Sequence, residues 1–189
     1  MDQKTEAEIV VRILKGDRQA FALLVEEYKT PIYNLAYKMT RNPEDAEDLA
    51  QETFLNSFRE LSRYDTKRRF YTWLYTIGLN LIRNHLKKTG RRQTNLRQVN
   101  ISSNAVISGA EKSIFIDAAD SEESREERKE QLEICLLKLS PDLRELLVLR
   151  FYQGLSFEDI AVITGFSQSA VKMRVYRGLE KLRKFIQEM

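Results

Sequence analysis

The stretch from residue 68 to residue 88, RRFYTWLYTIGLNLIRNHLKK, holds the chain's densest collection of chemically active side chains. It contains the only tryptophan, Trp73, and the only histidine, His85, and it has no acidic residue. Wound as a helix, it carries an apolar stripe and, beside it, a second stripe at alternating 3–4 spacing. The apolar stripe consists of Phe70, Leu74, Ile77 and Leu81, and the second stripe consists of Trp73, Thr76, Asn80, Arg83 and Lys87.

The second stripe changes along its length from aromatic through hydrogen-bonding to cationic. Cations suit phosphates, whereas unpaired bases bind to aromatic and amide groups by stacking and hydrogen bonding. The preceding loop, residues 62–69, adds Tyr64, Lys67, Arg68 and Arg69 and is suited to form a pocket for an extruded base. The pattern indicates a surface for single-stranded nucleic acid. The alternative is that the aromatic residues at its start only pack in a core.

A second candidate site lies in residues 155–185, LSFEDIAVITGFSQSAVKMRVYRGLEKLRKF, which have the pattern of a helix-turn-helix. Ser156, with Asp159 three residues later, is expected to cap a short helix, Gly165 allows a tight turn, and Ser167 caps a longer basic helix. The longer helix has a predicted buried stripe of Val171, Val175, Leu179 and Leu182, and a solvent face of Gln168, Ser169, Lys172, Tyr176 and Arg177. Such a face reads base edges in the major groove and contacts phosphates. A plain helical hairpin with a solvated basic face is the alternative.

An acidic block occupies residues 41–60, with six carboxylates against two arginines. A helix from Pro43 to about Leu61 would turn Ala46, Leu49, Ala50, Phe54, Phe58 and Leu61 inward and leave Asp45, Asp48, Gln51 and Glu52 outward. Because no histidine or cysteine joins these carboxylates, we expect no metal site there. Such a row is usually a solvated face, and the more interesting alternative is a docking surface for a basic protein partner.

The helix start and stop signals between these segments predict an all-α chain. Gly16 ends a first helix, Asp17 caps the next, Pro31 is expected to kink or interrupt it, and Asn42 with Pro43 starts the acidic helix. Residues 91–124 are polar and lack steady periodicity, which is typical of a flexible linker. We therefore expect two small helical domains, residues 5–90 and 125–189, joined by that linker; the second contains a helix that starts at Ser140-Pro141.

Composition limits the possible functions. The 31 Lys and Arg against 28 Asp and Glu give a net charge of only +3, but the charges lie in blocks of opposite sign, which suggests two kinds of partner. One cysteine, Cys135, permits no internal disulfide, and the chain has neither a membrane-length apolar run nor a signal-peptide core, so we expect a cytoplasmic protein. One His and one Cys in different domains offer no catalytic pair, so we expect no enzyme, no cofactor and no metal.

Four segments together resemble bacterial sigma factors of the extracytoplasmic-function (ECF) type. They are KGDRQAFALLVEEY, EDAEDLAQETFLNSF, FYTWLYTIGLNLIRNHLKK and LSPDLRELLVLRFYQGLSFEDIAVITGFSQSAVKMRVYRGLEKLRK, in that order. The resemblance implies that residues 5–90 are sigma region 2 and residues 125–189 are sigma region 4. It implies an alternative sigma factor that binds core RNA polymerase at its clamp, reads the −35 duplex, and melts and reads the −10 element. It also implies an anti-sigma factor as a further partner.

The resemblance assigns the candidate residues to three tasks. Polymerase docking falls to Asp45, Asp48, Gln51, Glu52 and Phe54; the −10 element to Tyr64, Lys67, Arg68, Trp73, Asn80, Arg83 and Lys87; and the −35 element to Gln168, Ser169, Lys172, Arg174 and Arg177. The family often has Gly-Thr where this chain has Ser169-Ala170, a departure that bears on base preference. A free-standing helix-turn-helix regulator is the alternative function, but it would not need the acidic face.

Overall fold

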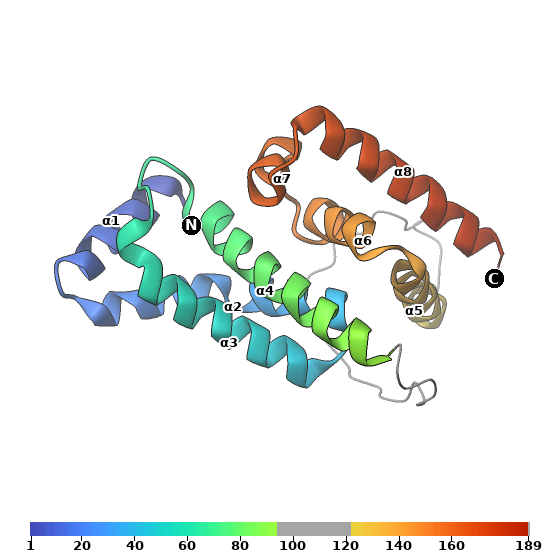
Figure 1. Ribbon diagram of the computed structural model, residues 1–189, viewed down its shortest axis with the longest axis horizontal. Coiled ribbons are helices and arrows are strands. Elements are labelled where there is room, and N and C mark those ends of the chain that lie inside the picture. The colour runs from blue at the N-terminus through green and yellow to red at the C-terminus, as the bar shows by residue number, and fades with distance from the viewer. Residues whose placement is uncertain (94–121, 189) are drawn as a thin grey trace. The chain divides into compact units, whose positions relative to one another are not determined.

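The computed structural model of the protein describes residues 1–93 and 122–188, and every regular element in these two ranges is a helix (Figure 1). The chain forms two compact units, Met1–Asn104 and Ala105–Met189. The predicted all-α fold with two helical domains is thereby confirmed. The predicted linker, residues 91–124, lies almost wholly outside the described residues, so its bounds and its flexibility stay predictions.

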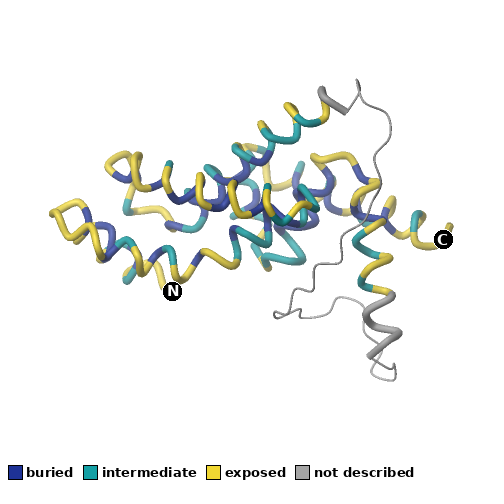
Figure 2. The backbone as a smooth tube through the Cα atoms, turned by 90° about the horizontal axis from the view of Figure 1, so that it is seen from below, coloured by how far each residue is buried: buried dark blue, intermediate teal, exposed yellow. Residues whose placement is uncertain are grey.

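The first unit begins with a short helix that packs on the first and the last of the longer helices that follow it. Its elements are α1 (Gln3–Leu14), η1 (Arg18–Ala20), α2 (Phe21–Thr40), α3 (Pro43–Glu60), η2 (Leu61–Arg63) and α4 (Phe70–Gln93). The long helices α2, α3 and α4 pack on one another, and the buried residues follow their inner faces (Figure 2). Leu24, Leu35, Phe70 and Leu74 have no exposed surface and form the centre of this core.

The start signals of the first unit act as the sequence predicted. Asp17 accepts a hydrogen bond from the Ala20 amide, and the Asn42 side chain accepts from the first amides of α3, which begins at Pro43. The helix α2 continues through Pro31, so the predicted interruption is wrong: the apolar residues on both sides of Pro31 are buried along one helix. The alternative, a kink at Pro31, stays a prediction.

The buried stripe of α4 is rotated from its predicted position. Ile77 and Leu81, which were expected in the core, are half-buried, whereas Leu79 and Ile82 are buried. Gly78 explains the rotation: it is buried between these residues, and a Cβ there would lie 3.3 Å from the Thr53 side chain of α3. Because glycine carries no apolar side chain, a hydrophobic pattern cannot show that this position faces a neighbouring helix.

In the described part of the second unit, four α-helices pack around a small core. Its elements are α5 (Glu122–Lys138), α6 (Pro141–Leu147), the π-helical turn η3 (Val148–Tyr152), α7 (Phe157–Thr164) and α8 (Gln168–Gln187). The helix α8 packs on α5, α6 and α7. Arg144 closes the end of α5: its guanidinium is buried and donates to the carbonyls of Leu136, Leu137 and Leu139. Burial lowers the pKa of Arg144.

Candidate functional site: an acidic face and two nucleic-acid surfaces

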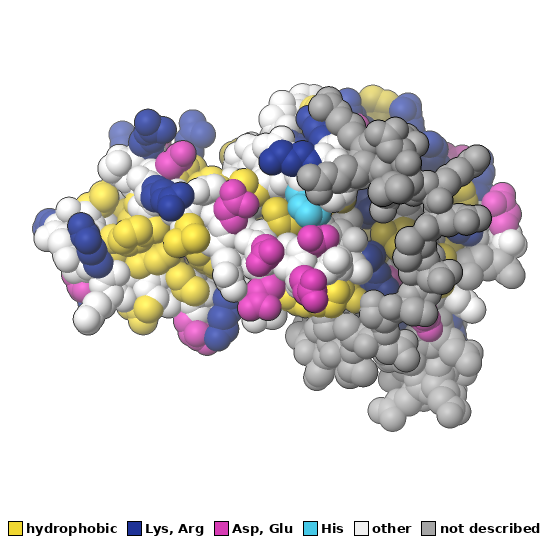
Figure 3. All heavy atoms as spheres, turned by 60° about the horizontal axis from the view of Figure 1, so that its bottom comes forward, with side chains coloured by type: hydrophobic (Ala, Val, Ile, Leu, Met, Phe, Trp, Pro, Cys, Tyr) yellow, Lys and Arg dark blue, Asp and Glu magenta, His cyan; other side chains and the backbone are white. Residues whose placement is uncertain are grey.

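The acidic face lies on the outer side of α3. Asp48, Gln51 and Glu52 are exposed and Asp45 is half-buried, as their spacing predicted. Phe54 differs from the other docking candidates, because only 8% of its surface is exposed and it lies in the core. Acidic side chains gather on this side of the first unit around the single histidine (Figure 3). The acidic face therefore presents carboxylates to solvent, and Phe54 is buried in the core beneath them.

Two apolar side chains extend this face, and the sequence pattern did not find them. Leu55 is 56% exposed, and Phe58, which was expected to point inward, is 38% exposed. The Phe58 ring contacts the ring of Phe21 edge to face, with centroids 4.9 Å apart, so the two helices share an apolar surface patch beside the carboxylates. The inward prediction for Phe58 is wrong, although its neighbours Ser57 and Leu61 are buried. A stripe that joins carboxylates to exposed apolar groups is typical of protein interfaces.

The loop before α4 is organised by Tyr64. Its side chain is buried, its hydroxyl donates to the Arg68 carbonyl, and its ring lies 5.5 Å from Phe70 and 5.2 Å from Trp73, centroid to centroid. Burial raises the pKa of Tyr64 to about 12, with smaller contributions from the carboxylates of Glu6 and Asp65. The structure thus places Tyr64 beneath the surface, where it supports the half-buried Trp73 rather than facing a ligand.

The remaining −10 candidates lie on the outer surface of the loop and of α4. Lys67, Arg68, Asn80 and Lys87 are exposed, and Arg83 is half-buried. Arg68 has a weak contact with Asp65, 3.8 Å between Nε and Oδ2. The predicted order of aromatic, amide and cationic groups is therefore present along one side of α4. These groups can stack on and donate to unpaired bases and neutralise phosphates.

Among the described residues, a contact between His85 and Asp45 joins the acidic face to α4. The Nε2 atom of His85 lies 3.3 Å from Oδ2 of Asp45, and both side chains are partly exposed. The histidine is thus on the helix of the −10 candidates, and its partner is on the helix of the docking candidates. No spacing pattern pairs these two residues, because they lie on different helices.

The second unit contains the predicted helix-turn-helix. Ser156 accepts from the Asp159 amide, Gly165 has the left-handed φ of 76° that ends α7, and Ser167 accepts from the Ala170 amide at the start of α8. Within the predicted buried stripe of α8, Leu179 is only half-buried. The neighbouring Gly178 is buried instead, and a Cβ there would lie 3.3 Å from the Leu147 side chain of α6. The buried side of α8 therefore packs against α6, and the opposite side of the helix is exposed.

The −35 candidates differ in their exposure to solvent. Gln168, Ser169, Lys172 and Arg177 are exposed, whereas Arg174 is half-buried with its guanidinium 3.8 Å from the Phe166 ring centroid. Stacking on an aromatic ring fixes the orientation of Arg174. Sequence reasoning left out Met173, which is 60% exposed on the same face, and it named Tyr176, 63% exposed, as part of the face without assigning it a task.

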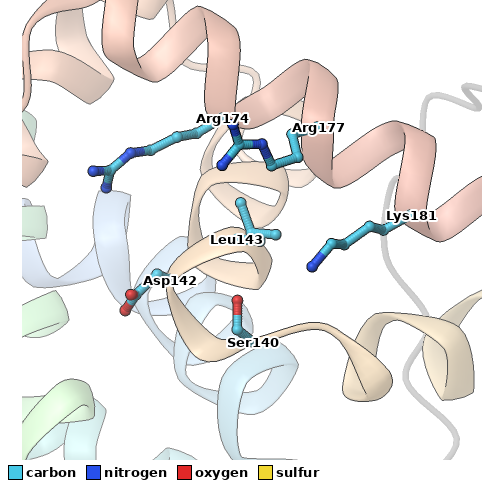
Figure 4. A pocket seen from close by; sticks show the side chains of 6 residues that line it. All are labelled: Ser140, Asp142, Leu143, Arg174, Arg177 and Lys181. Carbon is cyan, nitrogen blue, oxygen red and sulfur yellow. The ribbon is translucent and has the colours of Figure 1, made fainter.

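A shallow pocket of about 290 Å³ lies between α8 and the start of α6 (Figure 4). Its lining residues are Ser140, Asp142, Leu143, Arg174, Arg177 and Lys181. Figure 4 shows Lys181 extending from α8 toward Ser140 and Leu143 at the start of α6, whereas the Arg174 guanidinium lies farther from them. The pocket belongs to the basic edge of the recognition helix, and three cations against one carboxylate suit a phosphate group.

In the described ranges, no group of three or more His, Cys, Asp or Glu side chains is placed to hold a metal ion. None of the described helices combines the length and the apolar character needed to span a membrane.

Comparison with known proteins agrees with this division into units. Residues 24–92 match the family described as Sigma-70 region 2, and residues 129–182 match Sigma-70, region 4. The chain is 32% identical over 189 residues to the RNA polymerase sigma-H factor of Pseudomonas aeruginosa, covering 100% of this chain and 97% of that protein. It is 32% identical over 187 residues to the ECF RNA polymerase sigma factor SigW of Bacillus subtilis, covering 95% of this chain and 96% of that protein.

Solved structures show the same fold. CnrH, solved in complex with the cytosolic domain of CnrY, superposes with a TM-score of 0.69 at 22% identity, over 96% of this chain and 97% of that one. The sigma factor RpoE of Bartonella quintana, solved with the anti-sigma factor NepR, superposes with a TM-score of 0.67 at 23% identity, over 88% and 96%. At these identities the likeness concerns the fold.

Proposed function

The chain belongs to the family of ECF RNA polymerase sigma factors, and we propose that its three candidate surfaces divide the work of transcription initiation among them. As a member of this family it is an alternative sigma factor that directs promoter-specific transcription. The acidic face of α3, extended by Leu55 and Phe58, docks on core RNA polymerase. The loop at residues 64–69 and the outer side of α4 read the unpaired −10 strand, and the outward side of α8 reads the −35 duplex.

The observation that carries this assignment is the contrast between the adjoining helices α3 and α4. Asp48 and Glu52 present negative charge that would repel DNA, whereas Asn80 and Lys87 present amide and cationic groups that bind it. One small unit therefore carries a face for a protein and a face for nucleic acid. A free-standing helix-turn-helix regulator would use the second unit alone and would have no use for this arrangement.

Two further assignments follow from the same proposal. The polymerase supplies the bond-forming chemistry, so the chain needs no catalytic residue of its own, and its place of work is the cytoplasm, where bacterial polymerase acts. Because the exposed docking and DNA surfaces must be covered to keep the factor inactive, an anti-sigma factor is the expected third partner. Two structural neighbours, CnrH and RpoE, were solved in complexes, the latter with an anti-sigma factor.

The direct test uses core RNA polymerase with and without the purified chain. The proposal expects the chain to co-elute with core enzyme in gel filtration and to produce a defined set of transcripts, identified by sequencing their 5′ ends. Those ends locate a shared pair of promoter elements. A chain that binds promoter duplexes tightly by itself but never co-elutes with core enzyme would instead be a free-standing regulator.

A further inference from the structure

We propose that Glu6 and Gln3 of α1 are positioning residues that hold the −10 reading loop, residues 64–69, in its binding conformation. The inference rests on the function proposed above for this loop and for α4. It concerns a helix that lies outside residues 24–92, the segment matched as Sigma-70 region 2. It also concerns a buried carboxylate that none of the three candidate surfaces uses.

Glu6 is only 1% exposed, so its charge must be balanced inside the fold. One carboxylate oxygen, Oε2, accepts a hydrogen bond of 2.9 Å from the backbone amide of Phe70, the first residue of α4. The other, Oε1, accepts from the hydroxyl of Tyr28 on α2. The first amides of a helix lack intrahelical partners, and the helix dipole favours a negative charge beside them. Glu6 therefore caps α4 from 64 positions away in the sequence.

Two further hydrogen bonds fix the loop that precedes this cap. The side-chain amide of Gln3 donates to the Lys67 carbonyl at 2.9 Å, and the Tyr64 hydroxyl donates to the Arg68 carbonyl. With the Phe70 amide bound to Glu6, the backbone is held on both sides of Arg69. The side chains of Lys67 and Arg68 meanwhile stay exposed. The backbone of the loop is thus anchored to α1, and its cations are left for a ligand.

Anchoring matters because an unpaired strand offers little rigidity of its own. If the loop had to become ordered during binding, that ordering would reduce affinity, and it would reduce discrimination between bases because contacts could readjust. A loop already fixed by Gln3, Tyr64 and Glu6 presents Lys67, Arg68 and the neighbouring Trp73 in one geometry. We therefore assign to α1 a share in −10 recognition without direct contact to DNA.

The test uses polymerase assembled with the wild-type chain or a variant, and a promoter fragment taken from the transcript sequencing described above. Glu6→Gln keeps the shape of the side chain but removes the negative charge that lies beside the first amides of α4. Gln3→Ala removes the second anchor at an exposed position. Binding is measured on a template with a pre-melted −10 element, both with the wild-type strand and with single-base replacements. The −35 duplex, polymerase affinity and thermal unfolding are measured in parallel.

Glu6→Gln is expected to weaken binding to the pre-melted template about tenfold and to narrow the discrimination between bases by a similar factor. Gln3→Ala is expected to do the same to a smaller extent. Two controls match these changes. Glu8→Gln removes a neighbouring exposed carboxylate of α1, and Tyr28→Phe removes the other donor to Glu6 but keeps the Phe70 hydrogen bond. Both controls should discriminate between bases of the −10 element as well as the wild type does. Every variant should also keep the wild-type affinity for the −35 duplex and for polymerase.

The inference is overturned if Glu6→Gln and Gln3→Ala both fold and both discriminate between bases of the −10 element as the wild type does. If Glu6→Gln proves unfolded in the thermal measurement, Gln3→Ala decides alone, since its side chain is exposed. Arg68→Ala separates this failure from failure of the proposed function. If Arg68→Ala weakens binding to the pre-melted template while the α1 variants do not, only the role of α1 is wrong. If Arg68→Ala also has no effect, the −10 assignment of the loop fails, and the role of α1 fails with it.

Discussion

His85 on α4 and Asp45 on α3 face each other at 3.3 Å, and this contact makes Asp45 different from the other carboxylates of the acidic face. Asp45 already has a partner within the unit, whereas Asp48 and Glu52 have no ion-pair partner among the residues that the structure describes. The three were equivalent in the sequence pattern. The structure therefore leaves Asp48 and Glu52 as the carboxylates most available to a basic protein surface.

The His85–Asp45 contact itself should contribute little to stability. Both side chains are partly exposed, and ion pairs of this kind contribute about 1 kcal/mol or less. A double-mutant cycle with His85→Ala and Asp45→Ala, followed by denaturant unfolding, should give a coupling free energy within that range, and high salt should reduce it. A coupling of about 3 kcal/mol would show that the contact is a structural tie and not a surface pair.

Charge reversal at Asp48 and Glu52 should weaken association with core polymerase and leave the helical fold intact, because both side chains are exposed. The double variant Asp48→Lys, Glu52→Lys can be compared with wild type by gel filtration or by titration of labelled chain, with circular dichroism as the check on folding. Glu8→Lys is the matched control, since Glu8 is an exposed carboxylate on a different helix of the same unit. If the double variant binds polymerase as well as Glu8→Lys does, the docking assignment is wrong.

The second half of the same face can be tested by removing Leu55, which is 56% exposed. Leu55→Ser should lower polymerase affinity with little loss of stability, because surface substitutions usually change the free energy of unfolding by about 0.5 kcal/mol or less. Buried Leu49 of the same helix offers the contrast: Leu49→Ala should cost about 2–5 kcal/mol of stability. If Leu55→Ser binds polymerase with unchanged affinity, Leu55 takes no part in docking, and only the carboxylates of the face remain as candidates.

The sequence predicted the helices well and their mutual orientation less well. Caps at Asn42, Ser156 and Ser167 follow from local hydrogen bonding, so residue type and position were enough to locate them. The direction of the buried side of α4 depends on how close α3 comes at Gly78, which is a property of two helices and not of one. Local pattern therefore indicated which elements exist but placed Ile77 and Leu81 too deep.

The candidate site shows the same division. Exposed polar candidates such as Asp48, Asn80 and Lys172 lie where their helical spacing put them. Tyr64 was assigned to a binding surface but is buried, because an aromatic ring beside a surface and one beneath it give the same sequence pattern. Phe54 lies inward as its helical spacing predicted, and only the family resemblance had assigned it to docking. Nothing in the sequence pattern pointed to Glu6. Its carboxylate binds the backbone amide of Phe70, 64 positions along the chain, and no spacing rule connects the two residues.

High pH should unfold the first unit through its buried tyrosines. Burial raises the pKa of Tyr28, Tyr64 and Tyr75, and that of Tyr64 reaches about 12. In the unfolded chain these phenols ionise near pH 10. The folded state therefore keeps its full stability below about pH 10 and loses stability as the pH rises toward about 12, because only the unfolded chain can then release these protons.

This loss can be followed by the near-ultraviolet absorbance of phenolate together with circular dichroism. Phenolate from the buried tyrosines should appear together with the loss of helix. Tyr64→Phe should move the alkaline midpoint upward, and Tyr176→Phe, in the second unit and 63% exposed, should leave the midpoint of the first unit unchanged. Ionisation of all tyrosines before any helix is lost would contradict the burial argument.

Reading of the −35 duplex should depend on the outward side of α8. Lys172→Ala or Arg177→Ala should weaken binding of the closed, double-stranded promoter by about 1–3 kcal/mol if the residue contacts a base edge, and the loss should differ between promoter sequences. Arg183→Ala is the control, because it removes an exposed cation further from the turn. Equal losses for Lys172→Ala and Arg183→Ala on all sequences would show that Lys172 contributes only general charge.

Strand opening should depend on Asn80, which is exposed between the aromatic and cationic parts of the α4 stripe. Asn80→Ala should leave the −35 duplex affinity unchanged and reduce opening of the −10 element, because unpaired bases exist only after melting. Opening is measured by the permanganate reactivity of thymines on a duplex promoter, and binding is measured on a pre-melted template. Trp73 is a poorer probe, since its ring contacts those of Tyr64 and Phe70 and its truncation would cost about 3–5 kcal/mol of stability if it acts as a core residue.

The pre-melted template separates the two ways in which Asn80 can act. If Asn80 contacts an unpaired base, Asn80→Ala weakens binding to the pre-melted template as well as opening of the duplex. Gln19→Ala, which removes an exposed amide on η1 and not on α4, should behave as wild type in both assays. Equal opening and equal pre-melted binding by wild type and Asn80→Ala would remove Asn80 from the reading surface. The outer side of α4 would then be a solvated face whose cations, Arg83 and Lys87, serve only to attract the phosphate backbone.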